Sequence, residues 1–527
     1  MAKSKNMRWF HRAFARAAQL TGRTDDVEQG VRLADGLAQS VSSQGAMPRR
    51  TALKTMGALA ALPLTSAGCS KERRLANARV AIIGGGLAGL TAAVRLKDMG
   101  VTPLLFEATE RFGGRVRSIG GVLPEGKTFE AGGEFIDEDH TYMRSLAERY
   151  SLPLDDLDDT DLDGMRYAFN GAEVTTAELV EATAPYLPAF EADVAALEED
   201  YASKSAQLDA LTCAEYWDTM GIAGVCRAVL EAAVVSEFGR EPAHVSALHF
   251  VEDLPGVEDG STASDGAERY ILRDGNQALV DAMVEELGGL NGEYMFRWHR
   301  LKRVWSDGSK LGFYCEGKAY RTVDAMLIAM PLKALADVEF TFDLPDRLTN
   351  YISNSVMGTH SKVIAGFDST PWRDAGSNGD VLSDGPMQAC WDSNPKKDGQ
   401  GSLSFLIGGE PGANLPLNDV GGLVISYMNQ LAPLQLGTDG TRNGIQWGIN
   451  WAQEEGYTGS YTCLKPGQYT VVESLFFFDG DEDERQVPFL DNLAFIGESF
   501  SGDYWGYMEG AAQTGWMAAQ HLIDEVL

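Results

Sequence analysis

The feature that most constrains this chain is a short apolar run that leads through three glycines into a helix-forming segment. Val80–Ile83 is rich in β-branched residues, as in a buried strand of a parallel sheet, and Gly89–Lys97 carries a helix former at almost every position. The first N–H groups of such a helix have no partner within the helix, and its dipole favours negative charge. The sequence therefore predicts a strand, a glycine turn and a helix whose N-terminus can receive phosphate.

The glycine spacing and a later acid narrow the ligand. Gly84 permits a tight turn, Gly86 lets a pyrophosphate approach the backbone, and Gly89 lets the helix pack closely on the strand. A second apolar run, Val101–Phe106, ends at Glu107, where a carboxylate can accept both ribose hydroxyls and an arginine would have suited a 2′-phosphate. The pattern indicates a site for the ADP half of a dinucleotide.

Further motifs follow along most of the chain from about residue 79. The first is Arg111–Arg115, in which two glycines lie between two arginines. The others are Glu130–Ile136, Lys362, Ile496–Glu498 and Gly506–Ala511. In this order and distribution the chain resembles the flavin amine oxidase superfamily, which includes monoamine oxidases, polyamine oxidases and L-amino-acid oxidases. The resemblance implies FAD as the cofactor, which the glycine spacing alone does not show.

The resemblance also implies contacts to FAD. The backbone of Val304 would meet the adenine, Glu498 would lie near the ribityl chain or pyrophosphate, and the backbone of Met508 would contact the flavin where a helix begins. Ser460 falls where monoamine oxidases carry the cysteine that bonds the flavin, and Cys463 lies too far along, so we expect non-covalent FAD. The full set of expected cofactor residues is Gly84, Gly86, Leu87, Ala88, Gly89, Glu107, Gly114, Arg115, Gly132, Gly133, Glu134, Val304, Glu498 and Met508.

Three residues are expected to be catalytic by the same resemblance. Lys362 matches a lysine near flavin N5 that usually acts through a water molecule, and Tyr461 and Tyr507 match two walls of an aromatic cage. Two aromatic faces before the flavin would orient the C–H bond of an amine. We expect Glu134, Phe135, Trp391 and Trp505 to bind substrate.

The substrate class depends on the segment after Gly133. Many L-amino-acid oxidases have a Met-Arg pair there, whose arginine holds the α-carboxylate, but this chain has Glu134-Phe135. Arg166 or Arg373 could replace that arginine. Glu134, Asp137 and Glu138 could instead attract a distal amino or guanidino group, because carboxylates pair with such cations.

The predicted reaction is oxidation of a C–N bond in an amine or L-amino acid, with a basic amino acid as one option. Hydride would pass to flavin N5, the imine would hydrolyse, and O₂ would reoxidise the flavin and give H₂O₂. The alternatives are a quinone-linked amine or amino-acid dehydrogenase, a polyamine oxidase, a carotenoid-type flavin desaturase and a non-catalytic flavin-bearing module.

Bulk composition excludes some partners. The net charge of −32 argues against nucleic acid, whose phosphates would repel the chain. The six cysteines show no CxxC pair and no clustering with histidine, so we predict no metal site. A disulfide, and a homodimer as opposed to a monomer, both stay open.

The predicted fold class is α/β, a two-domain flavoprotein. It has a Rossmann-like FAD-binding domain, and a substrate domain with a mixed sheet and a helical subdomain. The Ala/Leu/Glu-rich stretch 176–238, with breaks near Pro185, Pro188 and Gly221, indicates the several helices of that subdomain. The expected boundaries are 79–140, 265–345 and 485–527 for the discontinuous FAD-binding domain, 141–264 and 346–484 for the substrate domain, and 1–78 for an extension ahead of the fold.

That extension has the plan of an export signal. The Arg49–Arg50 pair precedes the apolar run Met56–Ala67, which is too short for an ordinary membrane span. This is typical of a twin-arginine signal, so we expect the twin-arginine export machinery as a partner and a periplasmic or cell-envelope location. Cys69 lies in a degenerate lipoprotein box and is an alternative lipidation site. The native start, Met1 or Met47, stays open.

Overall fold

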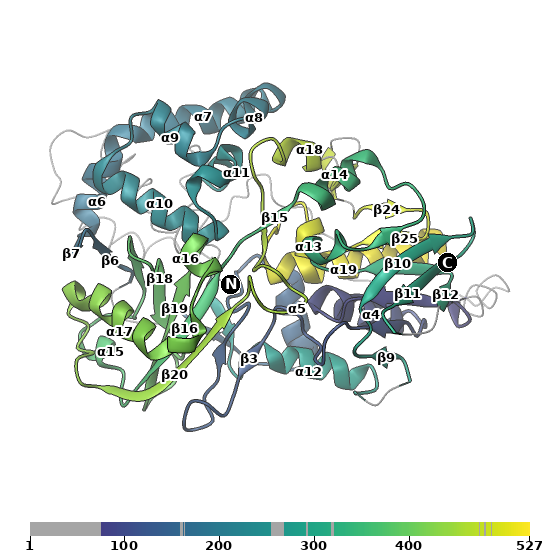
Figure 1. Cartoon of the computed structure of the whole chain (residues 1–527), viewed down its shortest axis with the longest axis horizontal. Helices are drawn as coiled ribbons and strands as arrows, with labels where there is room; N and C mark the ends of the chain where they lie inside the picture. Colours follow the sequence, from purple (N-terminus) through teal and green to yellow (C-terminus); the bar gives the residue numbers. More distant parts are fainter. Residues whose placement is uncertain are drawn as a thin grey trace, which may run out of the picture.

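The computed structural model describes residues 75–527 except 159–161, 163, 255–267, 291–292, 318–320, 474, 479–480 and 486. Within them the chain forms two lobes side by side, each built on its own sheet (Figure 1). The Arg49–Arg50 pair, the apolar run after it and Cys69 lie outside the described residues. None of the described helices is long and apolar enough to cross a membrane.

The first lobe is built on a six-stranded sheet whose centre is the predicted first strand. β1 pairs in parallel with β13 on one side and with β2 on the other, and all four of its residues are buried. Burial on both faces explains why this strand is apolar at every position. The strand order is β24 (Phe489–Leu490), β25 (Leu493–Phe495), β13 (Ala325–Ile328), β1 (Val80–Ile83), β2 (Leu104–Phe106) and β9 (Met295–Phe296).

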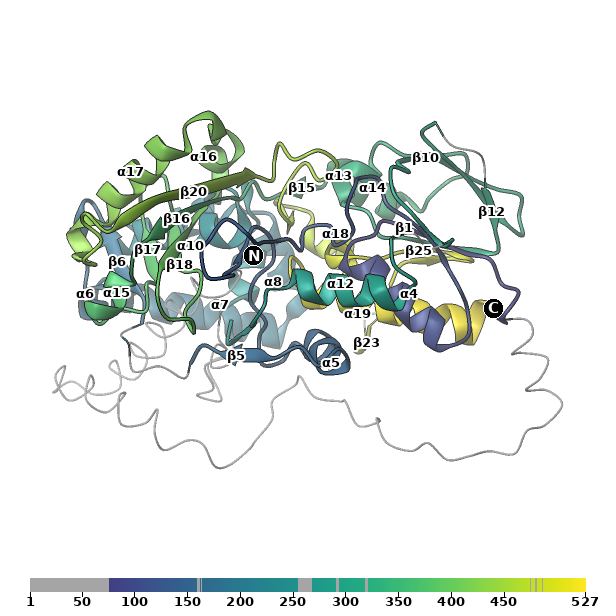
Figure 2. The same cartoon turned by 90° about the horizontal axis from the view of Figure 1, so that it is seen from below.

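Helices and a smaller sheet cover the two faces of this sheet. α4 (Leu87–Asp98) packs against α19 (Met508–His521) and α12 (Gln277–Glu286), and Figure 2 shows the three helices together below the strands. The smaller sheet has the order β12 (Arg321–Val323), β11 (Leu311–Cys315), β10 (Leu301–Ser306) and β14 (Glu339–Phe340). Asp307–Gly308, a residue pair typical of hairpin turns, lies between β10 and β11, with Gly308 at φ 90°.

The second lobe combines a seven-stranded sheet with a helical unit. The sheet order is β20 (Arg442–Asn450), β16 (Ser361–Phe367), β19 (Gly401–Ile407), β18 (Ala389–Asp392), β17 (Val381–Ser383), β6 (Arg166–Phe169) and β7 (Ala172–Glu173). The helices are α6 (Thr176–Thr183), α7 (Leu187–Glu199), α8 (Tyr201–Asp209), α9 (Cys213–Thr219), α10 (Gly224–Phe238) and α11 (Ala247–Glu252). Thr175 and Thr212 form capping boxes at α6 and α9, which explains where those helices begin.

These two sheets and helical layers agree with the predicted α/β class. Every strand of the six-stranded sheet comes from the ranges assigned to the FAD-binding domain, and every strand of the seven-stranded sheet from the ranges assigned to the substrate domain. One small sheet joins the two sets, because β5 (Leu154–Asp156) pairs with β8 (Tyr270–Leu272). The boundaries themselves stay a prediction.

Candidate active site

A cleft of about 160 Å³ runs along the carboxyl ends of β1 and β2 and reaches the segment that precedes α19. It lies where ligands bind in open α/β sheets. Among the predicted residues, those lining the cleft are Gly84, Gly86, Leu87, Ala88, Glu107, Gly114, Arg115, Gly133, Ser460, Tyr461, Glu498, Tyr507 and Met508.

The three glycines of the turn occupy different environments. Gly84 has φ +110°, which favours glycine, and a Cβ on Gly89 would lie 2.0 Å from the carbonyl oxygen of Gly84. Gly89 therefore allows the helix to touch the turn and does not line the cleft. A Cβ on Gly86 would meet only the Cα of Gly114, at 3.8 Å, so its surface faces open space.

The first turn of α4 leaves donors available at this place. Its N-cap is Gly86, and no side chain caps the helix. Leu87 and Ala88 line the cleft directly after that cap. Uncapped N–H groups and the positive end of the helix dipole form a site for a phosphate group.

Glu107 lies at the end of β2, beside the glycine turn. Its Oε2 accepts the backbone N–H of Gly85 at 2.9 Å. Its Oε1 accepts both the backbone N–H and the side-chain hydroxyl of Thr109, each at 2.8 Å. The side chain is buried and lines the cleft. These bonds hold the carboxylate in place for the ribose contact that the sequence predicts.

Of the two arginines in the Arg111–Arg115 motif, only Arg115 lines the cleft. Its guanidinium binds the carboxylate of Glu498 at 2.6 Å and the backbone oxygen of Ser460 at 2.8 Å. Arg111 instead donates to the carbonyl oxygens of Gly114 and Val116. Arg111 therefore holds the loop, and Arg115 is the cation of this motif that can reach a ligand in the cleft.

Val304, whose backbone was expected to meet the adenine, does not line the cleft. Val304 is fully buried in the small sheet, and its carbonyl accepts the N–H of Thr341 from the chain that follows β14. Leu301 and Lys302, at the start of the same strand, line the cleft in its place. The strand passes from the cleft into the core, so only its first residues can reach a ligand.

The other end of the cleft is formed by the start of α19. Tyr507 is its N-cap residue, and no side chain caps this helix. Met508 follows at the first helical position and lines the cleft. A second uncapped helix N-terminus therefore faces the cleft, as predicted for negative charge on a flavin.

The two predicted cage tyrosines both line the cleft and are held by histidines. The ring of Tyr461 stacks on His360 at 4.6 Å, and its hydroxyl donates to the carbonyl of Glu237 at 2.6 Å. The ring of Tyr507 lies edge-on to His140 at 5.2 Å. His360, which belongs to none of the motifs, is therefore the support of Tyr461.

His360 is neutral because it is buried. Burial lowers its pKa to about 3, and its Nδ1 and Nε2 lie 2.9 Å from Ser460 Oγ and from the carbonyl oxygen of Ser236. Ser460 lines the cleft, and its hydroxyl is directed at His360. Cys463 is fully buried in β21 (Thr462–Cys463) and does not line the cleft.

Lys362 lies on β16 with a fully buried ammonium group. Its Nζ donates to Glu134 Oε2 at 2.8 Å and to the carbonyl oxygens of Glu130 at 3.1 Å and Gly132 at 3.0 Å. An ammonium has three N–H donors, so these three acceptors use all of them. Because all three are used, Lys362 has no donor left for the water molecule that the family resemblance implies. Lys362 also does not line the cleft.

Three of the four expected substrate residues, Glu134, Phe135 and Trp391, lie together around this lysine. Trp391 donates through Nε1 to Glu134 Oε1 at 3.0 Å, and its ring lies 5.0 Å from the Lys362 ammonium and 5.7 Å from Phe135. Trp505 packs elsewhere, against Tyr469 and Phe476. Among the predicted residues, those outside the cleft lining are Gly89, Gly132, Glu134, Phe135, Val304, Lys362, Trp391 and Trp505.

Neither arginine proposed for a substrate carboxylate is available. Arg166 forms an ion pair with Glu173, and Arg373 binds the buried carboxylate of Asp392 at 2.6 Å. Removing Arg373 from Asp392 would leave a buried charge without its cation. Neither arginine is therefore a candidate for holding the carboxylate of a substrate.

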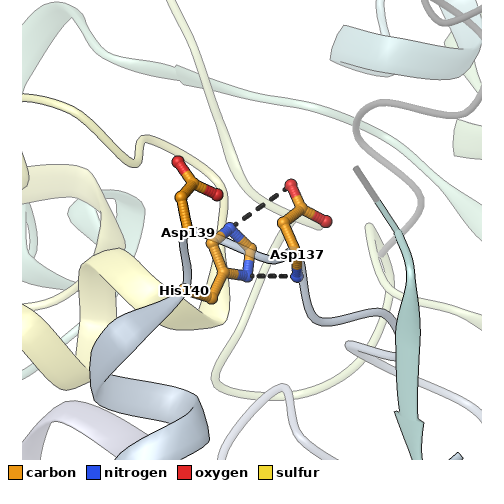
Figure 3. Close-up of side chains that lie close together, drawn as sticks. All are labelled: Asp137, Asp139 and His140. Carbon is orange, nitrogen blue, oxygen red and sulfur yellow. Dashed lines mark hydrogen bonds and ion pairs between the residues drawn. The ribbon is translucent and has the colours of Figure 1, made fainter. Parts of the chain in front are cut away.

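Asp137, Asp139 and His140 form the one group of three or more potential metal ligands among the described residues (Figure 3). His140 Nδ1 accepts the N–H of Asp137 at 3.0 Å, and Nε2 lies 3.4 Å from Asp137 Oδ2. Both ring nitrogens are thus directed at Asp137, which leaves no lone pair for a metal. Burial lowers the pKa of His140, so the ring is neutral as it supports Tyr507.

Sequence reasoning missed several residues of the cleft wall. His299, Arg300, Lys302, Tyr457 and Pro331 line it. His299, Arg300 and Lys302 lie at or just before the start of β10, a few residues ahead of the predicted Val304. The predicted contact at this strand was therefore the sequence signal that could have found them. Tyr457 lies in the same loop as the predicted Ser460 and Tyr461, a few residues ahead of them.

The chain is similar to known flavoproteins both in sequence and in fold. The model of a family described as flavin containing amine oxidoreductase matches residues 87–523. A probable flavin-containing monoamine oxidase A of Dictyostelium discoideum is 23% identical over 85% of this chain and 98% of its own, and an L-amino acid dehydrogenase of Synechocystis is 23% identical over 84% and 94%. The structure of cyclohexylamine oxidase from Brevibacterium oxydans superposes with a TM-score of 0.71 at 22% identity, covering 85% of this chain and 99% of that one.

Proposed function

Because the chain belongs to the family of flavin-containing amine oxidoreductases, we propose that it oxidises the C–N bond of an amine or an L-amino acid. It is an oxidoreductase, and its cofactor is FAD. One observation carries the proposal. A single cleft has an uncapped helix start and Glu107 at one end and Tyr461 and Tyr507 at the other.

The residues of the cleft fit FAD. The N-terminus of α4 and Arg115 would face the pyrophosphate, Glu107 the ribose, and the start of α19 the flavin ring. FAD supplies the acceptor for a hydride from the α-carbon at its N5 atom. Ser460 lines the cleft with a hydroxyl that is bonded to His360, in place of a cysteine, and this supports non-covalent binding.

The chain itself would bind and orient the amine. Tyr461 and Tyr507 present rigid rings that exclude water, and neither hydroxyl is expected to ionise, because burial raises the pKa of both well above its usual value. A neutral amine needs no protein base, so the two buried histidines act as supports. The imine product would hydrolyse in water, and O₂ would take the electrons and form H₂O₂.

A cationic substrate is supported by the charges around the tyrosines. Glu237 and Glu268 are buried, and their charges raise the pKa of both tyrosines further. Asp137 accepts the N–H of Glu268 and is bonded to His140 behind Tyr507. A diamine, a polyamine or a basic L-amino acid would offset this negative charge, and we propose these as the substrates.

A quinone-linked dehydrogenase is the second candidate. The relative from Synechocystis carries the name L-amino acid dehydrogenase, and the match covers 94% of it. A carotenoid-type desaturase is less well supported, because the cleft ends in two polar-tipped rings that a long apolar substrate does not need.

Anaerobic mixing of the flavoprotein with arginine, lysine, putrescine, spermidine and an aromatic amine tests the proposal. We expect bleaching of the flavin absorbance by one or more of the cationic compounds. No bleaching by any of them would contradict the proposed function and favour a non-catalytic flavin module. Readmission of air then separates the candidates, since an oxidase recovers its absorbance and produces peroxide, whereas a dehydrogenase needs an added quinone.

Two further proposals rest on the sequence. Non-covalent FAD predicts that acid precipitation releases all of the flavin into the supernatant. Export predicts that the chain reaches the periplasm or cell envelope by the twin-arginine machinery, and that replacing Arg49–Arg50 with Lys-Lys retains it in the cytoplasm. Flavin left in the pellet, or unchanged export of the Lys-Lys variant, would refute the respective proposal.

A further inference from the structure

The five backbone carbonyl oxygens of the segment 130–134 accept hydrogen bonds from three buried side chains that come from distant parts of the chain. Lys362 binds the first and the third oxygen, Trp451 Nε1 binds the second at 2.8 Å, and Asn276 binds the last two. Gly133 of this segment lines the cleft. The three side chains therefore fix one part of the cleft wall.

Asn276 is the member of this set that contacts two parts of the wall. Its Nδ2 donates to the carbonyl oxygens of Gly133 and Glu134, each at 2.9 Å, and lies 3.7 Å from Met508 Sδ. Gly133 and Met508 both line the cleft, and Met508 is the first residue of α19. Asn276 thus joins the wall at Gly133 to the helix start that is expected to face the flavin.

The side chain of Asn276 is not used for its own helix. Asparagine is well suited to cap a helix, and Asn276 is the N-cap residue of α12, but its side chain makes no bond to that helix. Two carbonyl oxygens at 2.9 Å require a donor, so the amide nitrogen faces them. Oδ1 is buried without a hydrogen-bond partner among the described residues, which is costly. The residue is thus placed for the two bonds to the wall.

These two bonds set the direction of the peptide dipoles in the wall. Gly133 lines the cleft and Asn276 does not, so the carbonyl oxygens bound to Asn276 are turned away from the cleft. The Gly133–Glu134 peptide is trans, so its N–H points opposite to its carbonyl oxygen. A flavin gains electrons when it is reduced, and fixed dipoles favour that change when their negative ends point away from it.

We propose that Asn276 is a positioning residue for the flavin, which keeps the carbonyl oxygens of Gly133 and Glu134 turned away from the cleft and holds that wall against the start of α19. Without Asn276 the two oxygens lose their donor and have to find another, and the water in the cleft is the nearest source. The negative ends of the dipoles would then face the flavin. The inference rests on FAD as the cofactor and not on which amine is oxidised.

Asn276→Leu tests the inference without any substrate, because leucine is similar in size, donates no hydrogen bond and keeps water out of the site. Fluorescence titration of the apoprotein should show FAD binding about tenfold more weakly, since two buried hydrogen bonds that hold the wall are lost. The reduction potential of the bound flavin should fall below that of wild type. Photoreduction with a reference dye at saturating FAD measures it.

Asn492→Leu is the matched control. The amide of Asn492 also donates to two carbonyl oxygens, those of Asp324 at 2.6 Å and Ser309 at 3.4 Å. Asn492 directly precedes β25, at the amino ends of the parallel strands β1, β13 and β25, whereas the cleft lies at the carboxyl end of β1. This variant should lose thermal stability but keep the FAD affinity and the reduction potential of wild type.

The outcomes separate a positioning role from a structural one. A folded Asn276→Leu protein with the FAD affinity and reduction potential of wild type would overturn the inference. If that variant does not fold, Asn276→Ala is measured in the same way and decides. Failure of both variants to fold at saturating FAD would show that Asn276 serves folding alone, which also overturns it. A failed amine oxidation leaves both measurements intact, so the two failures are distinguishable.

Discussion

The ammonium of Lys362 and the carboxylate of Glu134 lie 2.8 Å apart, with side chains that are 0% and 4% exposed. They are 228 positions apart in sequence, on β16 and on the segment that borders the cleft. Removing one member of a buried pair leaves the other charge uncompensated, which costs about 3–5 kcal/mol.

We therefore expect Lys362→Met to lower the free energy of unfolding by about 3–5 kcal/mol, and Lys362→Met combined with Glu134→Gln to recover much of that loss. Urea denaturation measures both. Lys310→Met, at the exposed pair with Asp324, is the control and should cost less than about 1 kcal/mol. Equal costs at the two lysines would show that the buried pair is not structural.

Two glycines of the turn should respond differently to alanine. In Gly89→Ala the new Cβ would lie 2.0 Å from Gly84 O, so we expect a loss of stability of about 1–3 kcal/mol or more. In Gly86→Ala the Cβ meets nothing closer than 3.8 Å, so the fold should be kept while the methyl group fills phosphate space. Thermal unfolding of the apoproteins and FAD titration separate the effects. An apoprotein of Gly86→Ala as unstable as that of Gly89→Ala would contradict this.

Glu107→Ala should weaken FAD. A hydrogen bond to a charged group contributes about 1.5–3 kcal/mol, so the dissociation constant should rise by roughly 10- to 150-fold. The measurement is fluorescence titration of the apoprotein with FAD. Glu110→Ala alters an exposed carboxylate three residues away and should bind FAD like wild type. If Glu107→Ala also binds like wild type, Glu107 does not contact the ribose.

His360 predicts a pH dependence of stability. Its pKa is about 3 in the folded protein and about 6.5 when unfolded, so below pH 6.5 the unfolded state binds the extra proton. Stability from this group is thus complete above about pH 6.5 and is lost as the pH falls toward 3, by up to roughly 1.4 kcal/mol per unit. The slope should be smaller in His360→Gln across that window, measured by urea denaturation at several pH values. An unchanged slope would assign the acid sensitivity to other groups.

Tyr507 should act through its ring. Tyr507→Leu removes an aromatic face that contributes about 0.5–1.5 kcal/mol, so kcat/KM for the amine should fall by about 2- to 12-fold, whereas Tyr507→Phe should stay near wild type. Steady-state kinetics with the substrate found by anaerobic bleaching provide the measurement. A loss in Tyr507→Phe as large as in Tyr507→Leu would point to the hydroxyl instead.

The sequence predicted the cofactor half of the site well because its signals are local. The β1 strand, the turn at Gly84 and the helix start at Gly86 follow one another within a few residues, and backbone sterics and helix geometry decide their form. The hairpin around Gly308 and the helix breaks between α6 and α10 depend on similar short-range rules. Family motifs added FAD and the two tyrosines.

The remaining half depended on contacts between distant segments. Periodicity places Lys362 on a strand, but not its ammonium against Glu134, and it places Val304 on β10 without showing that the strand has already left the cleft. His360 became the support of Tyr461 only when β16 met the loop before β21. The sequence by itself determined the cofactor cradle, because local backbone geometry specifies it. Only the tertiary structure decided which charges meet behind the cleft, because burial pairs each of them with whatever the fold brings within hydrogen-bond distance.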